Sequence, residues 1–432
     1  MTARIPDSSV AKVFSAALKG GALVDEGDTS IIFYDITHMR ARVDALKAAF
    51  PPATLHATAI KANPLLKIMR QLAALDLGFE AASLPELVLA ERTGVAANRI
   101  VFDSPAKTVS ELRRALELGC HINADSLAEL DRIATLIEGE GVETASTIGV
   151  RVNPQVGDGR IASTSVAGLS SKFGVALAEQ GAALVDRFAR HAWLEGLHLH
   201  IGSQGCSLAM LLGGIERVLE LANTIDATLA AKGERRRVRI FDIGGGLPVA
   251  YYPDATPDSM QSYAEAIGRR FGDLFSGRFR LITEFGRYVH ANSGWVASRV
   301  EYVKEGQAGK TLIVHVGADL LLRKCYSPAD WHHEIMVVDS RGNPKAGIDD
   351  SPYTVAGPPC FAGDILARGI RLPVVNEGDY VLIRDTGAYT LSMWSRYNSR
   401  QVPKVVGYTD EGEQFELRRE RETVEQAANF LE

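Results

Sequence analysis

The sequence predicts a (β/α)8 TIM barrel joined to a C-terminal β-sandwich or β-barrel domain, and three observations lead there. Eight short apolar segments recur between positions 55 and 285. Each is nearly continuous in apolar residues, as parallel strands buried on both faces are, and amphipathic helical stretches separate them. From about Arg287 the pattern changes to apolar runs with no helical stretches of comparable length between them. An α/β barrel followed by an all-β unit explains this change.

The expected barrel strands are all short. They are LHATAI (55–60), LGFEAA (77–82), RIVF (99–102), HINA (121–124), TIGVRV (147–152), LEGLHLH (194–200), VRIFDI (238–243) and RLITEF (280–285). Between them, Thr108–Glu111 and Ser126–Glu129 have the spacing of a capping box and predict two helix starts. Eight strand–helix units in succession favour a closed barrel over an open sheet.

The β-domain is expected to combine the two ends of the chain. Its runs include WVASRVEYV (295–303), KTLIVHVG (310–317), EIMVVD (334–339), YVLIRD (380–385) and KVVGY (404–408). An N-terminal strand near Ser30–Tyr34 would complete it. We therefore expect a barrel over residues 37–285 and a β-domain formed by residues 1–36 and 286–432.

Composition narrows the class of protein. The chain has 432 residues, of which 46% are hydrophobic and 23% charged, and its net charge is -6, which fits a globular protein with a large core. This charge balance gives no reason to expect nucleic acid or an anionic membrane as partner. No apolar run approaches the roughly 20 residues of a membrane helix, and the N-terminus is too polar for a secretory signal. The four scattered cysteines suggest no zinc site, so we expect no metal and a cytoplasmic location.

Ionisable residues and glycines stand where the expected strands end. Active sites of this fold lie at the C-terminal ends of the strands, where loops from different strands converge. The residues at these ends are Lys61, Glu80, Arg151, His200, Gly244, Gly245, Gly246 and Glu284. So many polar groups at one end of a barrel indicate a functional site.

Lys61 follows the first strand, within IKANP. Burying an ammonium is costly unless it is paired or neutral, so lysine is rarely placed there for packing. A desolvated lysine has a lowered pKa, which suits attack on an aldehyde. The alternative is a solvated loop lysine.

Three further segments suggest a phosphate site. The glycines of DIGGGLP (242–248) let backbone N–H groups approach an anion, although a tight turn without a ligand is the alternative. EFGR (284–287) adds a guanidinium, and HIGSQ (200–204) adds a hydroxyl. Alternation aims His198 and His200 the same way, although a strand histidine can simply be a satisfied core residue.

In this order, the motifs resemble the diaminopimelate and ornithine decarboxylase family, whose barrel is of the alanine-racemase type and binds pyridoxal 5'-phosphate. The resemblance runs from IIFYD (31–35) to YNSRQVPKVV (397–406). It rests on AIKANP, GFEAASLPEL, VRVNP, SSKFG, GLHLHIGSQ, DIGGGLP, EFGR, GPPCFAGD and DTGAYTLSMWSRYNSR. HIGSQ and YNSR are closer to the diaminopimelate branch.

The resemblance implies a role for each matching residue. Lys61 would hold the cofactor covalently, His200 would stack on its ring, and Glu284 would keep the ring nitrogen protonated. Glu80 and Arg151 would also lie at the cofactor. The phosphate would be held by Ser203, Gly244, Gly245, Gly246, Gly286, Arg287 and Tyr389. Cys360 would return a proton after carbon dioxide leaves, and would come from the partner subunit of a homodimer with shared active sites.

The departures from the family concern the substrate. Family members carry an acid just after the catalytic cysteine, and it meets the distal ammonium; Phe361 and Ala362 stand there instead. Arg323 aligns with the arginine that binds a distal carboxylate, and the motif places Tyr326 and Asp364 near the substrate. Another acid, such as Asp319 or Glu334, could substitute. Without one, diaminopimelate, lysine and ornithine are expected to be poor substrates.

These departures favour decarboxylation of an amino acid with a non-standard side chain, carboxylate-bearing or amine-conjugated, in a siderophore or other specialised pathway. The alternative is an ordinary meso-diaminopimelate decarboxylase of lysine synthesis. An amino-acid racemase would share the barrel and lysine but lacks HIGSQ and G-P-x-C. A non-catalytic regulatory homologue would not require Lys61, His200, Glu284 and Cys360 together.

Overall fold

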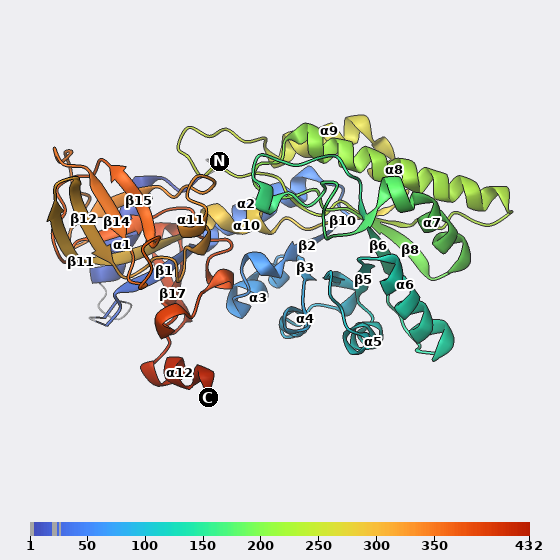
Figure 1. Cartoon of the computed structure of the whole chain (residues 1–432), viewed down its shortest axis with the longest axis horizontal. Helices are drawn as coiled ribbons and strands as arrows, with labels where there is room; N and C mark the ends of the chain where they lie inside the picture. Colours follow the sequence, from blue (N-terminus) through green and yellow to red (C-terminus); the bar gives the residue numbers. More distant parts are fainter. Residues whose placement is uncertain (1–3, 20–23, 26) are drawn as a thin grey trace. The chain divides into compact units, whose positions relative to one another are not determined.

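The computed structural model describes residues 4–19, 24–25 and 27–432, which form two compact units. One unit comprises residues 43–248 and 257–288, and the other comprises residues 1–42, 249–256 and 289–432. Each is described by itself (Figure 1). Among the described residues, no helix has both the length and the apolar character to cross a membrane.

The first unit is the predicted closed barrel. Its strands are β2 (Leu55–Ala59), β3 (Gly78–Ala81), β4 (Ile100–Asp103), β5 (His121–Ala124), β6 (Ile148–Asn153), β8 (Leu194–His198), β9 (Ile240–Asp242) and β10 (Arg280–Thr283). All their pairings are parallel, and the β5–β6 pairing closes the ring. All eight predicted strands are confirmed. They read as apolar runs because most of their residues are buried on both faces.

Helices connect the barrel strands. They include α3 (Leu66–Ala74), α4 (Leu84–Glu91), α5 (Val109–Leu118), α6 (Leu127–Ala134), α7 (Leu177–Arg190), α8 (Leu208–Ala231) and α9 (Met260–Arg270). Figure 1 shows α3, α4 and α5 on one side of the strands and α8 and α9 on the other. This covering leaves the C-terminal strand ends as the place where polar residues can gather.

The two predicted capping boxes differ in the structure. At α5 the box is complete, because Thr108 and Glu111 exchange side-chain and backbone hydrogen bonds. At α6 Ser126 accepts from the Glu129 N–H, but the Glu129 carboxylate accepts from the Asp125 N–H instead of the Ser126 N–H. Glu129 also pairs with Lys107 at 2.8 Å. The second box is therefore only half formed: the Ser126 side chain caps the helix, but the Glu129 carboxylate pairs with the buried Lys107 and does not return a hydrogen bond to Ser126.

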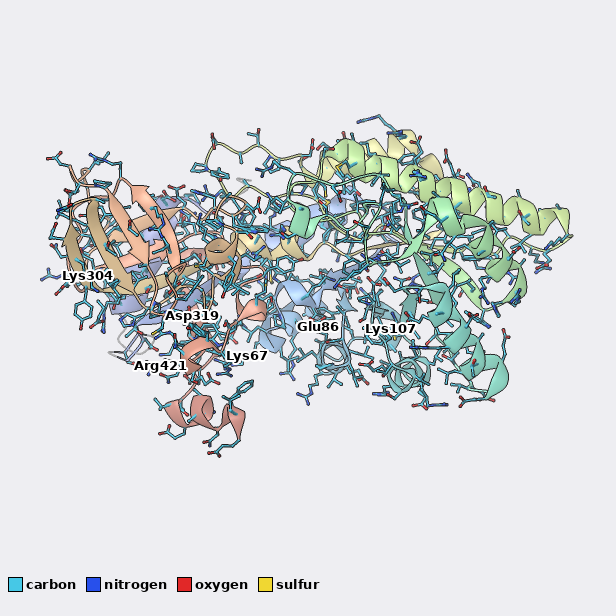
Figure 2. All side chains as sticks on the ribbon, viewed as in Figure 1. Lys67, Glu86, Lys107, Lys304, Asp319 and Arg421 are labelled. Carbon is cyan, nitrogen blue, oxygen red and sulfur yellow. The ribbon has the colours of Figure 1, made fainter. Side chains whose placement is uncertain are left out.

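Lys107 is an unusual buried cation, labelled in Figure 2. Its side chain is fully buried and donates to the carbonyls of Ser104 at 2.5 Å and Asn123 at 2.9 Å. Together with the Glu129 pair, these bonds tie the segment after β4 to strand β5 and helix α6.

The second unit is built on a nine-stranded mixed sheet. Its strands are β1 (Ser30–Asp35), β11 (Gly294–Gly306), β12 (Gly309–Val314), β13 (Ile335–Val338), β14 (Tyr353–Ala356), β15 (Ile365–Ile370), β16 (Tyr380–Ile383), β17 (Lys404–Thr409) and β18 (Gln414–Arg419). The predicted N-terminal strand is β1, which pairs with β11 and β17. A stacked pair, Phe33 and Trp295, lies in its core with ring centroids 4.2 Å apart.

Three strands of this sheet, β14, β15 and β18, were not among the predicted runs. The strands β15 and β18 end the sheet order, so each has only one neighbour. Their sequences, ILARGI and QFELRR, are polar because much of each strand faces solvent. Strand β14 has only four residues.

Candidate active site

Lys61 and Glu80 form an ion pair at the C-terminal ends of neighbouring strands. Lys61 lies in a single 3-10 turn (Ile60–Ala62) directly after β2, and Glu80 lies in β3. The Lys61 side chain is 40% exposed, whereas the Glu80 side chain is fully buried. Burial raises the pKa of Glu80 to about 8, although the charge of Lys61 opposes this shift. Glu80 therefore takes up a proton at a higher pH than an ordinary carboxyl does.

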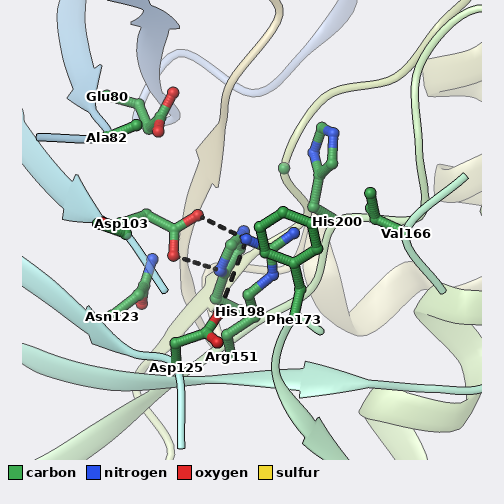
Figure 3. A network of polar contacts seen from close by, with 12 residues as sticks. Glu80, Ala82, Asp103, Asn123, Asp125, Arg151, Val166, Phe173, His198 and His200 are labelled. Carbon is green, nitrogen blue, oxygen red and sulfur yellow. Dashed lines mark hydrogen bonds and ion pairs between the residues drawn. The ribbon is translucent and has the colours of Figure 1, made fainter. Parts of the chain in front are cut away.

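A second group of charges lies in the barrel. Figure 3 shows its members on β4, β6 and β8 and after β5, and Glu284 follows β10. Arg151 Nη1 lies 3.1 Å from Asp103 Oδ2 and 3.9 Å from Asp125 Oδ1. His198 Nδ1 lies 3.7 Å from Asp103 Oδ1, and its Nε2 lies 3.7 Å from Glu284 Oε2. All of these side chains are buried, so water screens their charges little.

The pKa values in this group follow from burial and mutual charge. Burial alone would raise the pKa of Asp103, but Arg151 and His198 outweigh it and hold that pKa well below its usual value. Burial would lower the pKa of His198, but Asp103 and Glu284 raise it to about 9. Burial opposes a lowered pKa of Glu284, but His198 brings it below the ordinary value. At neutral pH Asp103 and Glu284 are therefore ionised, and His198 carries a positive charge.

His200 is the opposite case. Its Nδ1 accepts a hydrogen bond from the Gly245 N–H at 3.1 Å and lies 4.0 Å from Glu284 Oε2. Burial, assisted by Arg151, lowers the pKa of His200 to about 3, so its ring is neutral. Both His198 and His200 approach Glu284, as their alternation on the strand predicts, while Leu199 lies near α8.

The glycine segment after β9 is packed too tightly for side chains. Gly244 and Gly246 have φ of 60° and 110°, and a Cβ on Gly246 would lie 2.4 Å from the Gly202 carbonyl oxygen. A Cβ on Gly245 would lie 2.6 Å from the Glu284 carbonyl oxygen. Nearby, Arg287 Nε donates to Ser203 Oγ at 2.9 Å. Glycine backbone, a hydroxyl and a guanidinium thus meet, which suits a phosphate.

Gly286 opens α10 (Gly286–His290) close to the lysine turn. A Cβ at this position would lie 2.8 Å from Ala62 Cβ and 3.0 Å from Ala59 Cβ. Glycine therefore lets the segment after β10 approach the segment that carries Lys61.

The sheet unit holds the other predicted site residues. The Arg323 guanidinium lies 3.9 Å from the Trp331 ring centroid and 5.2 Å from that of Tyr389, and donates to the Ala388 carbonyl at 3.0 Å. Tyr389 has φ of 56°, a conformation that costs energy in a non-glycine residue. Aromatic contact on two sides fixes the guanidinium.

The motif GPPCFAGD forms a surface segment in this unit. Cys360 is exposed, whereas the other three cysteines are buried; its N–H donates to Asn398 Oδ1 at 2.7 Å. Phe361 stacks on Tyr326 with ring centroids 5.1 Å apart, and Ala362 is exposed. Asp364 is instead buried, and its Oδ1 accepts from the Ala318 N–H at 2.6 Å.

The two acids considered as substitutes have partners of their own. Asp319, labelled in Figure 2, pairs through Oδ2 with Arg400 Nε at 2.8 Å. Its Oδ1 accepts from the Gly317 N–H at 2.8 Å. Glu334 lies 3.2 Å from His332 Nε2. Either acid would have to give up these contacts to meet a substrate ammonium.

Sequence reasoning missed three acids of the barrel site: Asp103, Asp125 and Asp242. Asp103 and Asp125 follow the apolar runs RIVF and HINA directly, and Asp242 ends β9. Asp242 accepts from Asn123 Nδ2 at 3.3 Å and from the Gly244 N–H at 2.9 Å. Their signal was their place at strand ends: Asp103 and Asp125 lie just outside runs defined by apolar residues, and Asp242 lies inside the run VRIFDI (238–243).

The barrel site has acceptors that fit pyridoxal phosphate. Glu80 Oε1 and Glu284 Oε1 are buried, with no hydrogen-bond partner in the described part of the chain. Buried acceptors without partners are costly, and a ring N–H or a hydroxyl of a ligand would satisfy them. The glycine segment with Ser203 and Arg287 provides for the phosphate. The residues present therefore fit this cofactor.

Comparison with known proteins agrees with the site. Residues 36–291 match the family model described as "Pyridoxal-dependent decarboxylase, pyridoxal binding domain". A diaminopimelate decarboxylase of Zymomonas mobilis is 33% identical, with 88% of this chain and 86% of the relative covered. Another, from Methanothermobacter thermautotrophicus, is also 33% identical, with 94% and 93% covered.

Solved structures point to the same family. The diaminopimelate decarboxylase of Helicobacter pylori, crystallised in complex with L-lysine, has a TM-score of 0.81 and 29% identity, with 94% of this chain and 97% of that one covered. In sequence and fold, the chain belongs to the pyridoxal-dependent decarboxylases, and it is an enzyme of their diaminopimelate branch that uses pyridoxal phosphate.

Proposed function

We propose that this enzyme decarboxylates meso-diaminopimelate, with the cofactor attached to Lys61. The observation that carries the proposal is the set of curated diaminopimelate decarboxylases that match nearly the whole chain at 32–34% identity. These relatives favour this substrate over the non-standard amino acid of a siderophore or other specialised pathway, which no comparison supports.

In this proposal the barrel residues bind and orient the cofactor. The bound cofactor supplies an electron sink for the pair released when the Cα–carboxylate bond breaks. Lys61 would anchor it, with the Glu80 carboxyl next to the Lys61 amine. Glu284 would accept a hydrogen bond from the ring nitrogen, and the neutral His200 would support the ring. In the barrel, the phosphate would be held by Ser203, Gly244, Gly245, Gly246, Gly286 and Arg287, and Arg151 would keep Asp103 ionised.

The sheet residues are proposed to select the substrate. Arg323, fixed between Trp331 and Tyr389, binds the distal carboxylate. Tyr326 and Phe361 form an aromatic wall, and Cys360 donates the proton that replaces the lost carboxylate. Asp364 supports this segment from within, through its bond to the Ala318 N–H.

The aromatic stack favours a second candidate, an amino acid whose distal amine is acylated. Tyr326 and Phe361 offer no charge to an ammonium, and Asp319 and Glu334 have other partners. Desolvating an unpaired ammonium costs several kcal/mol. Such an acylated substrate would keep its carboxylate for Arg323.

Carbon dioxide release from a panel of amino acids distinguishes these substrates. We expect meso-diaminopimelate to react with kcat/KM above about 10⁴ M⁻¹s⁻¹. Lysine and ornithine should react roughly 10²-fold more slowly or worse, because they lack the carboxylate that Arg323 binds. The matched variant Arg323→Gln should remove most of this difference. Preference for an N-acylated substrate over meso-diaminopimelate would instead establish the second candidate.

We further propose that two subunits share their active sites, with Cys360 acting in the neighbour's site. The exposure of Cys360, alone among the four cysteines, supports this. Mixed Lys61→Ala and Cys360→Ala subunits should recover up to about one active site in four, because a mixed two-fold dimer holds one intact site. Carbon dioxide release by the mixture measures the recovery, and the mass of the dimers shows whether mixed dimers have formed. Proven subunit exchange without recovery would place Cys360 in its own subunit's site or outside any site.

A further inference from the structure

His198 lies among three acids, Asp103, Asp242 and Glu284. Its side chain is fully buried, and neither ring nitrogen has a hydrogen-bond partner among the residues that the structure describes. Instead, each nitrogen faces one carboxylate, Asp103 and Glu284, at 3.7 Å. Asp242 is the residue next to it in register on β9. The main interaction of this buried imidazole is therefore electrostatic attraction to the two carboxylates.

The groups that face His198 come from every neighbouring element. The acids are Asp103 on β4, Asp242 on β9 and Glu284 after β10, and the basic groups are His121 and His200. Glu80, Lys61 and Arg151 act on these neighbours of His198: Glu80 on Glu284, Lys61 on Asp103 and Glu284, and Arg151 on Asp103 and His200. Burial and Glu284 raise the pKa of Asp242 well above its usual value. Asp103 and Glu284 remain as the nearest negative charges and outweigh the burial of His198.

His121 on β5 is a second buried histidine of the barrel, and its pKa is shifted in the opposite direction from that of His198. Its Nδ1 contacts Thr147 Oγ1 at 2.7 Å, and its Nε2 contacts Asn123 Oδ1 at 3.0 Å. Burial lowers the pKa of His121 to about 4, so it is neutral. His198 differs because carboxylates, not neutral oxygens, face its nitrogens.

We propose that His198 is a positioning residue that holds a positive charge against Glu284 and so keeps this carboxylate ionised for the ring nitrogen of the cofactor. Without that charge, Glu284 would have the acids Glu80 and Asp103 nearby and would take up a proton more readily. A neutral carboxyl would not stabilise a protonated ring. This inference rests on the role proposed for Glu284.

The experiment compares holoenzymes of His198→Gln and the control His121→Gln. Nitrogen-15 NMR of labelled cofactor reports whether the ring nitrogen is protonated. We expect full protonation between about pH 6 and pH 8 in the parent and control, and partial loss in His198→Gln. The acidic limb of its kcat/KM profile should move up by about one pH unit, because the Glu284 pKa rises. Its kcat should fall roughly 10-fold with little change in KM.

Two further measurements keep the inference testable. The imidazole nitrogens of His198 in the unmodified holoenzyme should give signals of a protonated ring up to about pH 8 even if the variant fails to fold. An unprotonated ring would overturn the inference, as would an unchanged cofactor signal and pH profile in His198→Gln. Asp103, His198 and Glu284 offer atoms within 4.8 Å of one another, so a stoichiometric metal in the holoenzyme would also overturn it. If Glu284→Ala had no effect, the proposed role of Glu284 would fail instead.

Discussion

Lys61→Ala will abolish turnover and the visible absorbance of the lysine-bound cofactor. An amine that forms a covalent bond to the cofactor cannot be replaced by packing, so we expect a loss of roughly 10⁴-fold or more. The Lys61 side chain is 40% exposed and pairs with Glu80, which leaves the amine accessible to an aldehyde. Absorbance of the purified protein and carbon dioxide release measure the two effects.

A surface lysine of the same unit provides the control. Lys47 is exposed, and its amine donates to the Leu75 carbonyl at 3.2 Å, so Lys47→Ala should keep the absorbance and the rate. Normal turnover by Lys61→Ala would show that the cofactor is attached elsewhere.

Glu284→Ala will bind the cofactor but decarboxylate roughly 10²-fold more slowly or worse. The carboxylate is buried, and His198 holds its pKa below the ordinary value, so it meets the ring as an anion. Its charge stabilises the electron-rich transition state more than the ground state, and the loss should therefore appear in kcat.

Glu284→Gln separates charge from shape, because it keeps the size but not the charge. We expect it to be nearly as slow as the alanine variant, whereas Glu220→Ala, at an exposed position of α8, should be unaffected. An unchanged kcat in Glu284→Ala would mean that this acid is structural.

The barrel could be predicted because its strands are buried on both faces, which leaves a clear apolar signal. A search for apolar runs failed at the edge strands of the sheet and at the ends of the barrel strands. Strands β15 and β18 border the sheet and carry polar residues, and Asp103 and Asp125 stand one residue beyond apolar runs. Their importance comes from long-range neighbours such as Arg151, which no local pattern reveals.

The site could be predicted only in part, for a related reason. Lys61, His200 and Glu284 stand in motifs that carry a resemblance, so their positions were expected. The charge of His198 depends on Asp103, which is 95 residues away in the chain and meets it only in the closed barrel. Likewise, the Glu129 carboxylate does not complete the expected capping box, because it pairs with the buried ammonium of Lys107.

The buried Lys107 connects the rigidity of the barrel to the acidity of its centre. Its ammonium fastens the segment after β4 to β5 and α6, and its charge also lowers the pKa of Asp103 at the end of β4. Lys107, which is not among the expected cofactor-binding residues, thereby contributes both to folding and to the ionisation of Asp103, on which the charge of His198 depends. A substitution of Lys107 would therefore change both the stability of this part of the barrel and the protonation of Asp103.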